Sequence, residues 1–332
     1  MAWLERHWQH TTLVGLLFYP LSIVYRVVVA LRRLLYRIGV FPAARLPVPV
    51  IIVGNITVGG TGKTPVVLWL ANFLQERGRR PGIVSRGYRG IKTAPTAVAA
   101  ASDPVMCGDE PVLLAQRSGV PVWIGADRAA AATALLAANP QCDIIISDDG
   151  LQHYRLARDA EIAVIDGARG LGNGHFLPAG PLREPAERLA DVDAIVVNIS
   201  QSAAVALQAN APATFAMVLQ SRGFHNLLNP QHTAAPEHFQ SRQVHAVAGI
   251  GNPQHFFAQL QRLGLMFTAH SFPDHHAFRP TDLAFPGADF VIMTEKDAVK
   301  CRSFATELYW ALRVDAEIDP VFGELVLAKL GK

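Results

Sequence analysis

Cysteine is scarce in this chain. The 332 residues contain three cysteines, Cys107, Cys142 and Cys301, which lie far apart and form no CxxC pair. A disulfide-stabilised secreted domain needs several cysteines, and a structural zinc site commonly uses them in closely spaced pairs. The composition therefore excludes both classes and favours a protein of the reducing cytosol.

The chain also lacks an uncharged apolar run of the length that spans a bilayer. The segment from Thr11 to Tyr25 is uncharged, but its fifteen residues are interrupted by Pro20. About 20 residues are needed to cross the hydrocarbon core. No small-residue cleavage site follows, and the next stretch is rich in arginine, so a cleaved signal peptide is not expected.

Acidic residues are nearly missing from the N-terminus. Up to Arg45 there are six arginines against Glu5 alone, a net charge of +5, so the rest of the chain carries −2 of the total +3. This predicts an apolar, arginine-studded helix or helical pair that lies on or dips into the anionic cytoplasmic leaflet of a membrane. A helix packed on the protein's own core and a single membrane span are the alternatives. No nucleic-acid partner is expected.

A glycine-rich loop is the most informative motif in the chain. It follows the apolar run Val48 to Val53 and ends in Lys63-Thr64, with Thr57 where the G-x-x-x-x-G-K-[ST] pattern has glycine. Backbone N–H groups of such a loop converge on phosphate oxygens, while the lysine reaches the β- and γ-phosphates and the hydroxyl ligates Mg²⁺. The predicted ATP-binding residues are Thr57, Val58, Gly59, Gly60, Thr61, Gly62, Lys63 and Thr64.

Two carboxylates form a second motif that fits the first. The apolar run Ile144 to Ile146 leads through Ser147 into Asp148, Asp149 and Gly150. Ligands bind at the C-terminal ends of strands in open α/β sheets, and carboxylate oxygens suit Mg²⁺. We therefore predict a Walker-B magnesium site made by Thr64, Asp148 and Asp149. An acidic turn that merely caps the next segment is the alternative.

Short apolar runs alternate with helical patterns beyond the loop. This predicts an α/β fold of the P-loop NTPase type, a mainly parallel sheet flanked by helices, with a smaller C-terminal α/β subdomain. The expected regions are an N-terminal segment 1–45, a P-loop core 46–200, a linking region of uncertain structure 201–242 and a C-terminal part 243–332 that completes the active site. The expected strands are 81–85, 121–124, 143–147, 162–166, 194–198, 244–248, 265–270, 290–293 and 308–312, and the expected helices are 65–76, 110–118, 127–138 and 253–263.

Several polar clusters follow these strands. Arginines in the turn Ser85 to Gly90 are suited to an anionic group, although a solvated turn fits the pattern as well. Asp109 and Asp127 open predicted helices, where each would serve as an N-cap, and Arg128 next to the latter is a candidate phosphate contact. The turn Gly249 to Asn252 is a weak partial match to a dinucleotide-binding loop. His270, Asp274, His275 and His276 match no usual metal motif and suit proton transfer better.

Together these motifs are similar to those of one family in order and spacing. The chain resembles the tetraacyldisaccharide 4′-kinases over essentially its full length. The resemblance implies transfer of the ATP γ-phosphate, with Mg²⁺, to the 4′-hydroxyl of a tetraacyldisaccharide 1-phosphate glycolipid, at the cytoplasmic face of the bacterial inner membrane. The motifs that carry it are Gly54 to Pro65, Ser85 to Tyr88, Gly108 to Pro111, Asp148 to His153, Leu182 to Pro185, Phe272 to His276 and Thr294 to Asp297.

The resemblance also implies roles for individual residues. Lys63 binds phosphate, and Asp109, supported by His275, is the base for the acceptor hydroxyl. His276 is the alternative partner of Asp109. No obligate protein partner is implied. Residues with an implied substrate or phosphate contact are Arg86, Glu110, Arg128, Gln152, His153 and Arg183.

Two other classes of protein remain as rivals. An ATPase or GTPase switch of the ParA or metallochaperone type would share the P-loop, but a ParA-like loop has lysine near its start, where Val58 stands. Thr294 to Asp297 likewise does not match the base-reading motif of GTPases. A membrane-bound scaffold with a degenerate nucleotide site is the other rival, and the intact Lys63, Thr64 and Asp148-Asp149 argue against it.

Overall fold

The computed structural model describes residues 7–10, 12–88, 90–92, 94–199 and 212–331. Its strands are β1 (Val50–Gly54), β2 (Pro81–Ser85), β3 (Thr96–Val98), β4 (Val122–Ile124), β5 (Ile144–Asp148), β6 (Ala160–Asp166), β7 (Ala194–Asn198), β8 (Ala213–Asn226), β9 (Thr233–Ala234), β10 (Val244–Ala248), β11 (Thr268–Ser271), β12 (Phe290–Thr294) and β13 (Tyr309–Ile318). Its α-helices are α2 (Leu13–Arg37), α3 (Lys63–Glu76), α4 (Pro104–Cys107), α5 (Asp109–Ser118), α6 (Arg128–Ala138), α7 (Pro253–Arg262), α8 (Glu295–Cys301) and α9 (Val321–Leu330). Short 3₁₀ segments cover Ala186–Ala190, Pro236–Phe239, Pro280–Leu283 and Arg302–Phe304.

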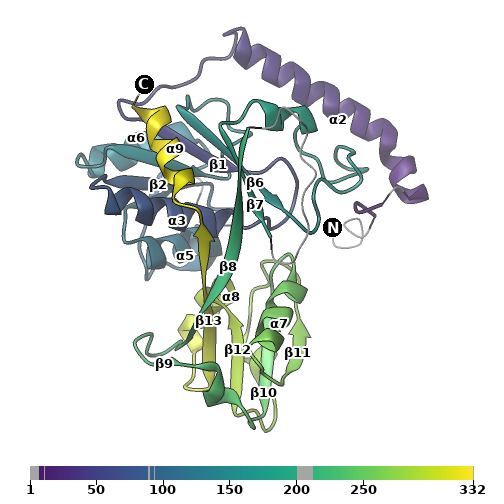
Figure 1. The fold of residues 1–332 in the computed structure, drawn as a ribbon, viewed down its shortest axis with the longest axis vertical. Coiled ribbons are helices and arrows are strands. Elements are labelled where there is room, and N and C mark those ends of the chain that lie inside the picture. Colours follow the sequence, from purple (N-terminus) through teal and green to yellow (C-terminus); the bar gives the residue numbers. More distant parts are fainter. Residues whose placement is uncertain (1–6, 11, 89, 93, 200–211, 332) are drawn as a thin grey trace.

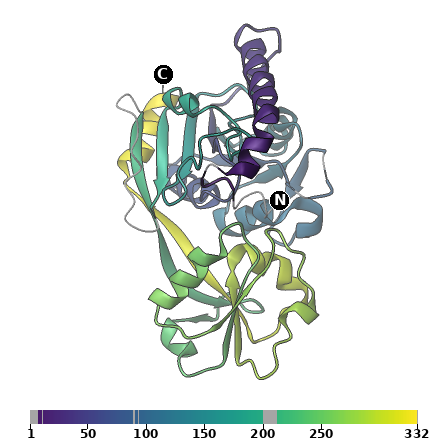
Figure 2. The ribbon, with the colours of Figure 1, turned by 90° about the vertical axis from the view of Figure 1, so that its right-hand side faces the viewer.

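All of these strands belong to one sheet. Its order is β11-β10-β12-β13-β8-β7-β6-β1-β5-β2-β4-β3, with β9 paired to β8 beside this path. The two halves of the sheet lie one above the other, the P-loop half at the top and the C-terminal half below (Figures 1 and 2). The predicted α/β class with a smaller C-terminal part is confirmed.

The P-loop half has a parallel centre covered on both faces. Strands β2, β5, β1, β6 and β7 are parallel to their neighbours. Strands buried on both faces read as continuous apolar runs, which is why Ile144 to Ile146 are wholly buried. Helices α3, α5 and α9 pack on one face and α6 on the other. This arrangement brings the C-terminal ends of β1, β2 and β5 to one edge.

The C-terminal half is a smaller parallel sheet. Strands β11, β10, β12 and β13 are parallel to one another. Apolar side chains of α7 fill the core on one face, and those of α8 fill the core on the other. Helix α8 begins directly after β12 ends, so its first turn lies at the edge of this sheet that faces the P-loop half (Figure 1).

Strand β8 joins the two halves. The linking region had no clear strand pattern, but its described part contains this 14-residue strand. The first residues of β8 pair in parallel with β7, and most of the strand pairs antiparallel with β13. Strand β13 itself continues beyond the predicted end at Leu312 to Ile318. Residues 200–211 of the predicted region lie outside the described residues.

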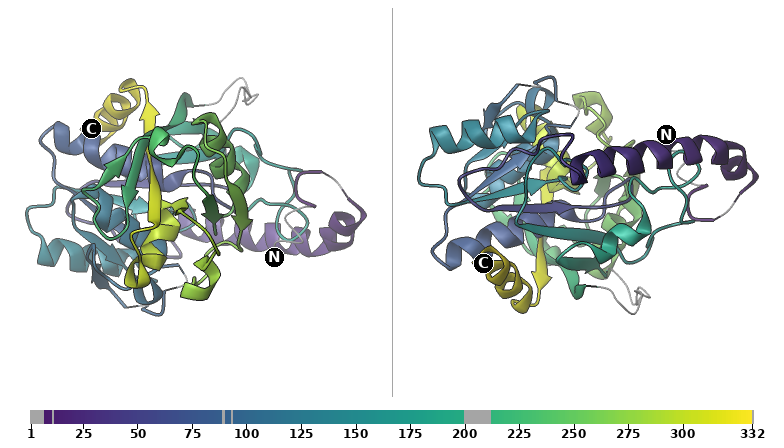
Figure 3. Two further views of the ribbon diagram at one scale, coloured as in Figure 1. Left: turned by 90° about the horizontal axis from the view of Figure 1, so that it is seen from below. Right: turned by 90° about the horizontal axis from the view of Figure 1, so that it is seen from above.

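Helix α2 is one continuous helix through Pro20, not a helical pair. Thr12 caps it by accepting a hydrogen bond from the backbone of Gly15. The Ser22 hydroxyl donates to the Phe176 carbonyl (2.7 Å) and accepts from the Ala179 amide (3.0 Å). These contacts hold α2 along the outside of the P-loop half (Figures 1 and 3).

Most of α2 is exposed, which contradicts the alternative of a helix packed on the protein's own core. Only Gly15 and Ser22 are buried within it. The helix is long and apolar enough to cross a membrane by length and composition, so the expectation that Pro20 left too short a segment was wrong. Its exposed apolar side chains include Leu16, Leu17, Leu21, Ile23, Val24, Val27, Val28, Leu31 and Leu34.

Helix α9, at the end of the chain, packs back onto the P-loop half. The ring of Phe322 lies 5.4 Å from that of Trp69 on α3. Gly323 lies so close to Phe73 that an added Cβ would come within 2.4 Å of its ring. The P-loop helix is therefore covered by residues that follow the C-terminal half in sequence.

Candidate active site

The P-loop has the backbone conformation that phosphate binding requires. It connects the buried strand β1 to α3, and Gly59 and Gly62 have φ values of 102° and 97°, which favour glycine. A Cβ at Gly62 would lie 2.8 Å from Met217 Cε and 2.9 Å from Asn198 Nδ2, so two neighbouring strands crowd the loop. The Thr61 hydroxyl is buried and has no hydrogen-bond partner in the described structure. The loop thus offers unpaired polar groups at the start of α3.

Three charged groups meet at the base of this loop. Lys63 Nζ lies 3.5 Å from Asp149 Oδ1, and the Arg183 guanidinium contacts both oxygens of that carboxylate, at 3.0 and 3.2 Å. Arg183 Nε also donates to the Thr57 carbonyl (3.1 Å), which ties it to the loop. Burial alone would raise the pKa of Asp149, but the charges of Lys63 and Arg183 outweigh it and lower that pKa. The sequence prediction placed these residues in one site, and the structure brings them together.

Asp148 is a buried carboxylate that is short of partners. Its Oδ2 accepts a hydrogen bond from Ser85 (3.0 Å), while its Oδ1 has none in the described structure. Burial and the nearby negative charges of Glu110 and Asp149 raise the pKa of Asp148 to about 7. A divalent cation would relieve both the missing partner and the repulsion, so the Asp148 and Asp149 carboxylates suit Mg²⁺, and Thr64 remains the predicted third ligand.

Arg128 presents a further binding group at the same edge. It is the first residue of α6, whose N-cap is Asp127 as predicted, and its side chain is buried. Nη1 donates to the Gly125 carbonyl (3.1 Å), but Nε and Nη2 have no partner in the described structure. Burial lowers the pKa of Arg128 to about 10, which leaves it cationic at neutral pH. Two unpaired donors on a buried cation are suited to an anionic oxygen.

Three other residues with a predicted substrate or phosphate contact, Gln152, His153 and Arg86, differ in burial and in hydrogen bonding. Gln152 donates to the Asn55 carbonyl (3.0 Å), which links the Walker-B segment to the P-loop. Burial and the nearby charges of Arg128 and Arg86 lower the pKa of His153 to about 3, so its imidazole is neutral. Arg86 is exposed. Arg89 of the same turn lies outside the described residues.

Asp109 and His275 form a direct pair. His275 Nδ1 lies 2.8 Å from Asp109 Oδ2 and 3.0 Å from Oδ1, although 166 residues separate them. His276 instead contacts Asp282 (3.0 Å), so the geometry selects His275 as the partner. The N-cap of α5 is Gly108, and Asp109 is the first helical residue, which argues against a mere capping role. Burial would raise the pKa of Asp109, but the hydrogen bond to His275 and the charge of Lys296 lower it.

The loop that carries His275 is held by residues that sequence reasoning did not assign. His275 adopts a φ of 59°, and its backbone N–H donates to the Gly249 carbonyl (3.1 Å). The Gly249 amide in turn donates to the buried Asp297 at the start of α8 (3.0 Å). The turn that resembled part of a dinucleotide loop therefore supports His275. The signal for this was the Thr294 to Asp297 motif at a strand end, to which we had given no role.

The C-terminal half closes over the P-loop next to a cavity. A Cβ on Gly251 would lie 3.4 Å from the backbone nitrogen of Gly60. A cavity of about 300 Å³ opens beside this contact, between the P-loop, the segment around Arg169, the N-terminal Trp8 and Asp274. Thr57 and Asp274, on the two halves, both line it. Space for a substrate thus adjoins the phosphate-binding loop.

Comparisons with known proteins agree with this geometry. A family model described as tetraacyldisaccharide-1-P 4′-kinase matches residues 14–331. The tetraacyldisaccharide 4′-kinase of Methylobacillus flagellatus is 51% identical over 99% of this chain and 96% of its own length. That of Alkalilimnicola ehrlichii is 53% identical over 94% of this chain and 92% of its own.

A solved structure shares the whole fold. The crystal structure of LpxK from Aquifex aeolicus in complex with ATP has a TM-score of 0.81 and 29% identity, and the match covers 96% of this chain and all of that one (100%). The family model spans both halves of the sheet and nearly all of α2. The chain is therefore a kinase that belongs to the tetraacyldisaccharide-1-P 4′-kinase family.

Proposed function

We propose that this protein transfers the γ-phosphate of ATP to the 4′-hydroxyl of a tetraacyldisaccharide 1-phosphate glycolipid, a step of lipid A biosynthesis. The observation that carries the proposal is the Asp109–His275 pair at the edge that also holds the P-loop and Asp148. In a switch ATPase the attacking group is water, whereas a kinase that acts on a sugar must instead accept the proton of the acceptor hydroxyl. The pair supplies a buried carboxylate for that proton.

The residues divide the reaction among them. A bond forms between the acceptor oxygen and the γ-phosphorus while the bond to the bridging oxygen of ADP breaks, and the hydroxyl proton moves to Asp109. Lys63 and the P-loop amides hold the phosphates, and the free donors of Arg128 contact phosphate oxygens. Thr64, Asp148 and Asp149 would hold Mg²⁺, which would neutralise negative charge on the phosphates during transfer.

An assay with γ-labelled ATP and purified disaccharide acceptor tests the proposal. We expect label in the glycolipid, no transfer to an analogue that lacks the 4′-hydroxyl, and little free phosphate. Release of labelled phosphate at the same rate with and without acceptor would instead identify the ATPase switch. Label in the 4′-deoxy analogue would show that a different hydroxyl is used.

Loss of the magnesium site is expected to abolish most of the activity. Asp148→Asn removes the charge that a divalent cation needs but keeps the shape of a fully buried side chain, so the Mg²⁺ concentration for half-maximal rate should rise at least tenfold. Asp143→Asn, at a partly exposed carboxylate just before the same strand, is the matched control. Undiminished transfer in excess chelator would rule out this metal site.

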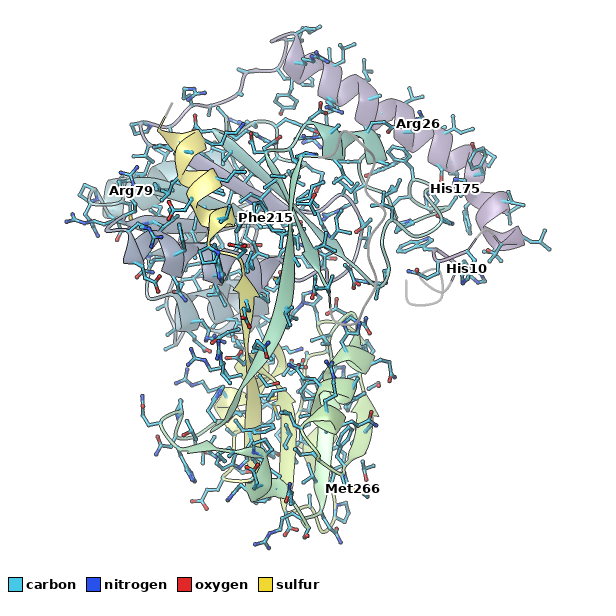
Figure 4. All side chains as sticks on the ribbon, viewed as in Figure 1. His10, Arg26, Arg79, His175, Phe215 and Met266 are labelled. Carbon is cyan, nitrogen blue, oxygen red and sulfur yellow. The ribbon has the colours of Figure 1, made fainter. Side chains whose placement is uncertain are left out.

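We further propose that α2 binds the cytoplasmic face of the inner membrane. The helix carries a row of exposed apolar side chains together with Arg32 and Arg37, both exposed. Its other side contacts the protein, where the Tyr19 ring meets that of His175 (5.3 Å) and the Arg26 guanidinium lies over the Phe176 ring (5.9 Å). Figure 4 labels Arg26 on α2 and His175 next to this helix. Apolar burial and attraction to anionic lipid would then act together.

Vesicle binding should depend on both the charge and the apolar face. Leu17→Glu with Val24→Glu places two charges on side chains that are 78% and 61% exposed, and we expect co-sedimentation with anionic vesicles to fall at least tenfold. High salt should weaken binding of the intact protein only in part. Val321→Glu, at an exposed apolar residue of α9, is the control. Equal sedimentation of a chain truncated before Phe41 would refute the anchor.

A further inference from the structure

Lys296 has no role in the reaction described so far, yet it lies at the junction of the two halves. It is the second residue of α8, and its side chain is only 17% exposed. Its Nζ lies 2.9 Å from Glu110 Oε1 on α5, 3.5 Å from Asp274 Oδ1 and 3.4 Å from His275 Nε2. One ammonium group therefore contacts the residues on either side of the Asp109–His275 pair.

The charge of Lys296 is secure despite its burial. Burial alone would lower the pKa of Lys296, but the carboxylates of Glu110, Asp109 and Asp274 outweigh it and raise the pKa above its ordinary value. An ammonium group has three donors and no acceptor. His275 Nε2, which faces this ammonium group, must therefore act as an acceptor. A ring nitrogen can accept only when it carries no hydrogen.

The Nδ1 side of the His275 ring must donate a hydrogen bond rather than accept one. His275 Nδ1 faces the Asp109 carboxylate at 2.8 Å, and an ionised carboxylate only accepts, so Nδ1 must carry the hydrogen. Asp274 Oδ2 lies 3.6 Å from Nε2, which is beyond hydrogen-bond distance and farther than the ammonium. Both faces of the ring thus favour the same tautomer.

We infer that Lys296 is a positioning residue that holds His275 in the tautomer with hydrogen on Nδ1 and none on Nε2. This inference rests on the proposed function in one respect, the fate of the proton. With Nδ1 already donating to Asp109, the hydroxyl proton of the acceptor passes to the Asp109 carboxylate, and His275 keeps its own hydrogen and steadies the carboxyl group. Without the ammonium, Nε2 would be free to carry hydrogen, and the Asp109 carboxylate alone would fix the protonation of the ring, at Nδ1 only.

The experiment reads the two ring nitrogens directly. The full-length protein, labelled with ¹⁵N in histidine, is examined by NMR at one fixed pH near 8, and the His275 signals are identified by their loss in His275→Gln. We expect a protonated Nδ1 and an unprotonated Nε2. Lys296→Met keeps the length of the side chain but removes its donors, and it should allow hydrogen on Nε2 in a substantial part of the population, while Asp109 keeps hydrogen on Nδ1. Lys296→Arg, another cation without an acceptor, should retain the native pattern.

Kinetics and a matched control distinguish a loss of His275 positioning from a general disturbance of α8. Lys296→Met should lower kcat by about 10- to 100-fold with little change in KM for ATP, as for other partners that orient a reacting side chain. Glu295→Gln disturbs the neighbouring contact of α8, an ion pair with Arg117, without touching His275, and it should leave the nitrogen pattern unchanged.

Two outcomes would overturn the inference. One is a native protein with hydrogen on Nε2, and the other is an unchanged His275 pattern in Lys296→Met, whatever its rate. A failure of the proposed function would look different. If the protein shows the expected nitrogen pattern but phosphorylates no glycolipid, the tautomer assignment stands and only the proposed proton transfer to Asp109 is refuted.

Discussion

Replacing Lys63 by alanine is expected to lower kcat for phosphate transfer by about 10²- to 10³-fold while the protein stays folded. Removal of a single preorganised donor from developing negative charge commonly costs about 3–4 kcal/mol of transition-state stabilisation. The Lys63 ammonium contacts Asp149 rather than the apolar core, so the fold does not depend on it. Initial rates with saturating acceptor, together with a thermal unfolding curve, measure both parts of the expectation.

A lysine outside the site provides the control for this substitution. Lys329 on α9 is partly exposed and pairs with Asp193 (2.8 Å), so Lys329→Ala should leave the rate nearly unchanged. A Lys63→Ala protein that turns over at the normal rate would show that the P-loop does not bind the transferred phosphate. A protein that unfolds on this change would make Lys63 a structural residue.

Substitutions of Asp109 and His275 are expected to act as one change. A positioned proton acceptor is worth about 10²- to 10⁴-fold in rate, so Asp109→Ala should lower kcat by this amount with little effect on ATP binding. His275→Ala should cost less or the same, because it acts through the 2.8 Å contact with Asp109. In the double variant the loss should be close to that of Asp109→Ala alone.

The neighbouring histidine is the matched control for this cycle. His276 contacts Asp282 and not Asp109, so His276→Ala should keep kcat within a few-fold of the native value. Losses that multiply in the double variant would give Asp109 and His275 independent roles. Near-normal turnover in Asp109→Ala would return that residue to the role of a helix terminus.

Prediction from sequence succeeded where burial is complete and local signals mark the ends of elements. Strands β2, β7 and β10 have the predicted bounds, and nearly all of their residues are buried. Strand β8 escaped notice because much of it is exposed and its middle reads Leu219-Gln220-Ser221-Arg222, without regular alternation. The pairing of β8 with both β7 and β13 comes from tertiary contacts that no short window contains.

Part of the candidate site could likewise be predicted from the sequence, and part could not. Lys63, Asp148 and Asp149 follow buried strands, so their meeting at one edge is a rule of parallel sheets. The contacts of Lys296 with Glu110 and with Asp274 join residues 186 and 22 positions apart, and no spacing rule connects them. The sequence did not decide between one helix and a helical pair for this segment, because Pro20 costs a helix one hydrogen bond but does not have to end it.

The position of α9 bears on how the protein is made. The last helix of the chain covers α3, with Gly323 against Phe73. On the ribosome, the nucleotide-binding half would emerge first yet lack this cover until Val321–Leu330 has also emerged. Nascent chains that end before Val321 should therefore expose the apolar back of the P-loop helix, and a stop codon near the end of the message would damage the first half of the protein rather than the last.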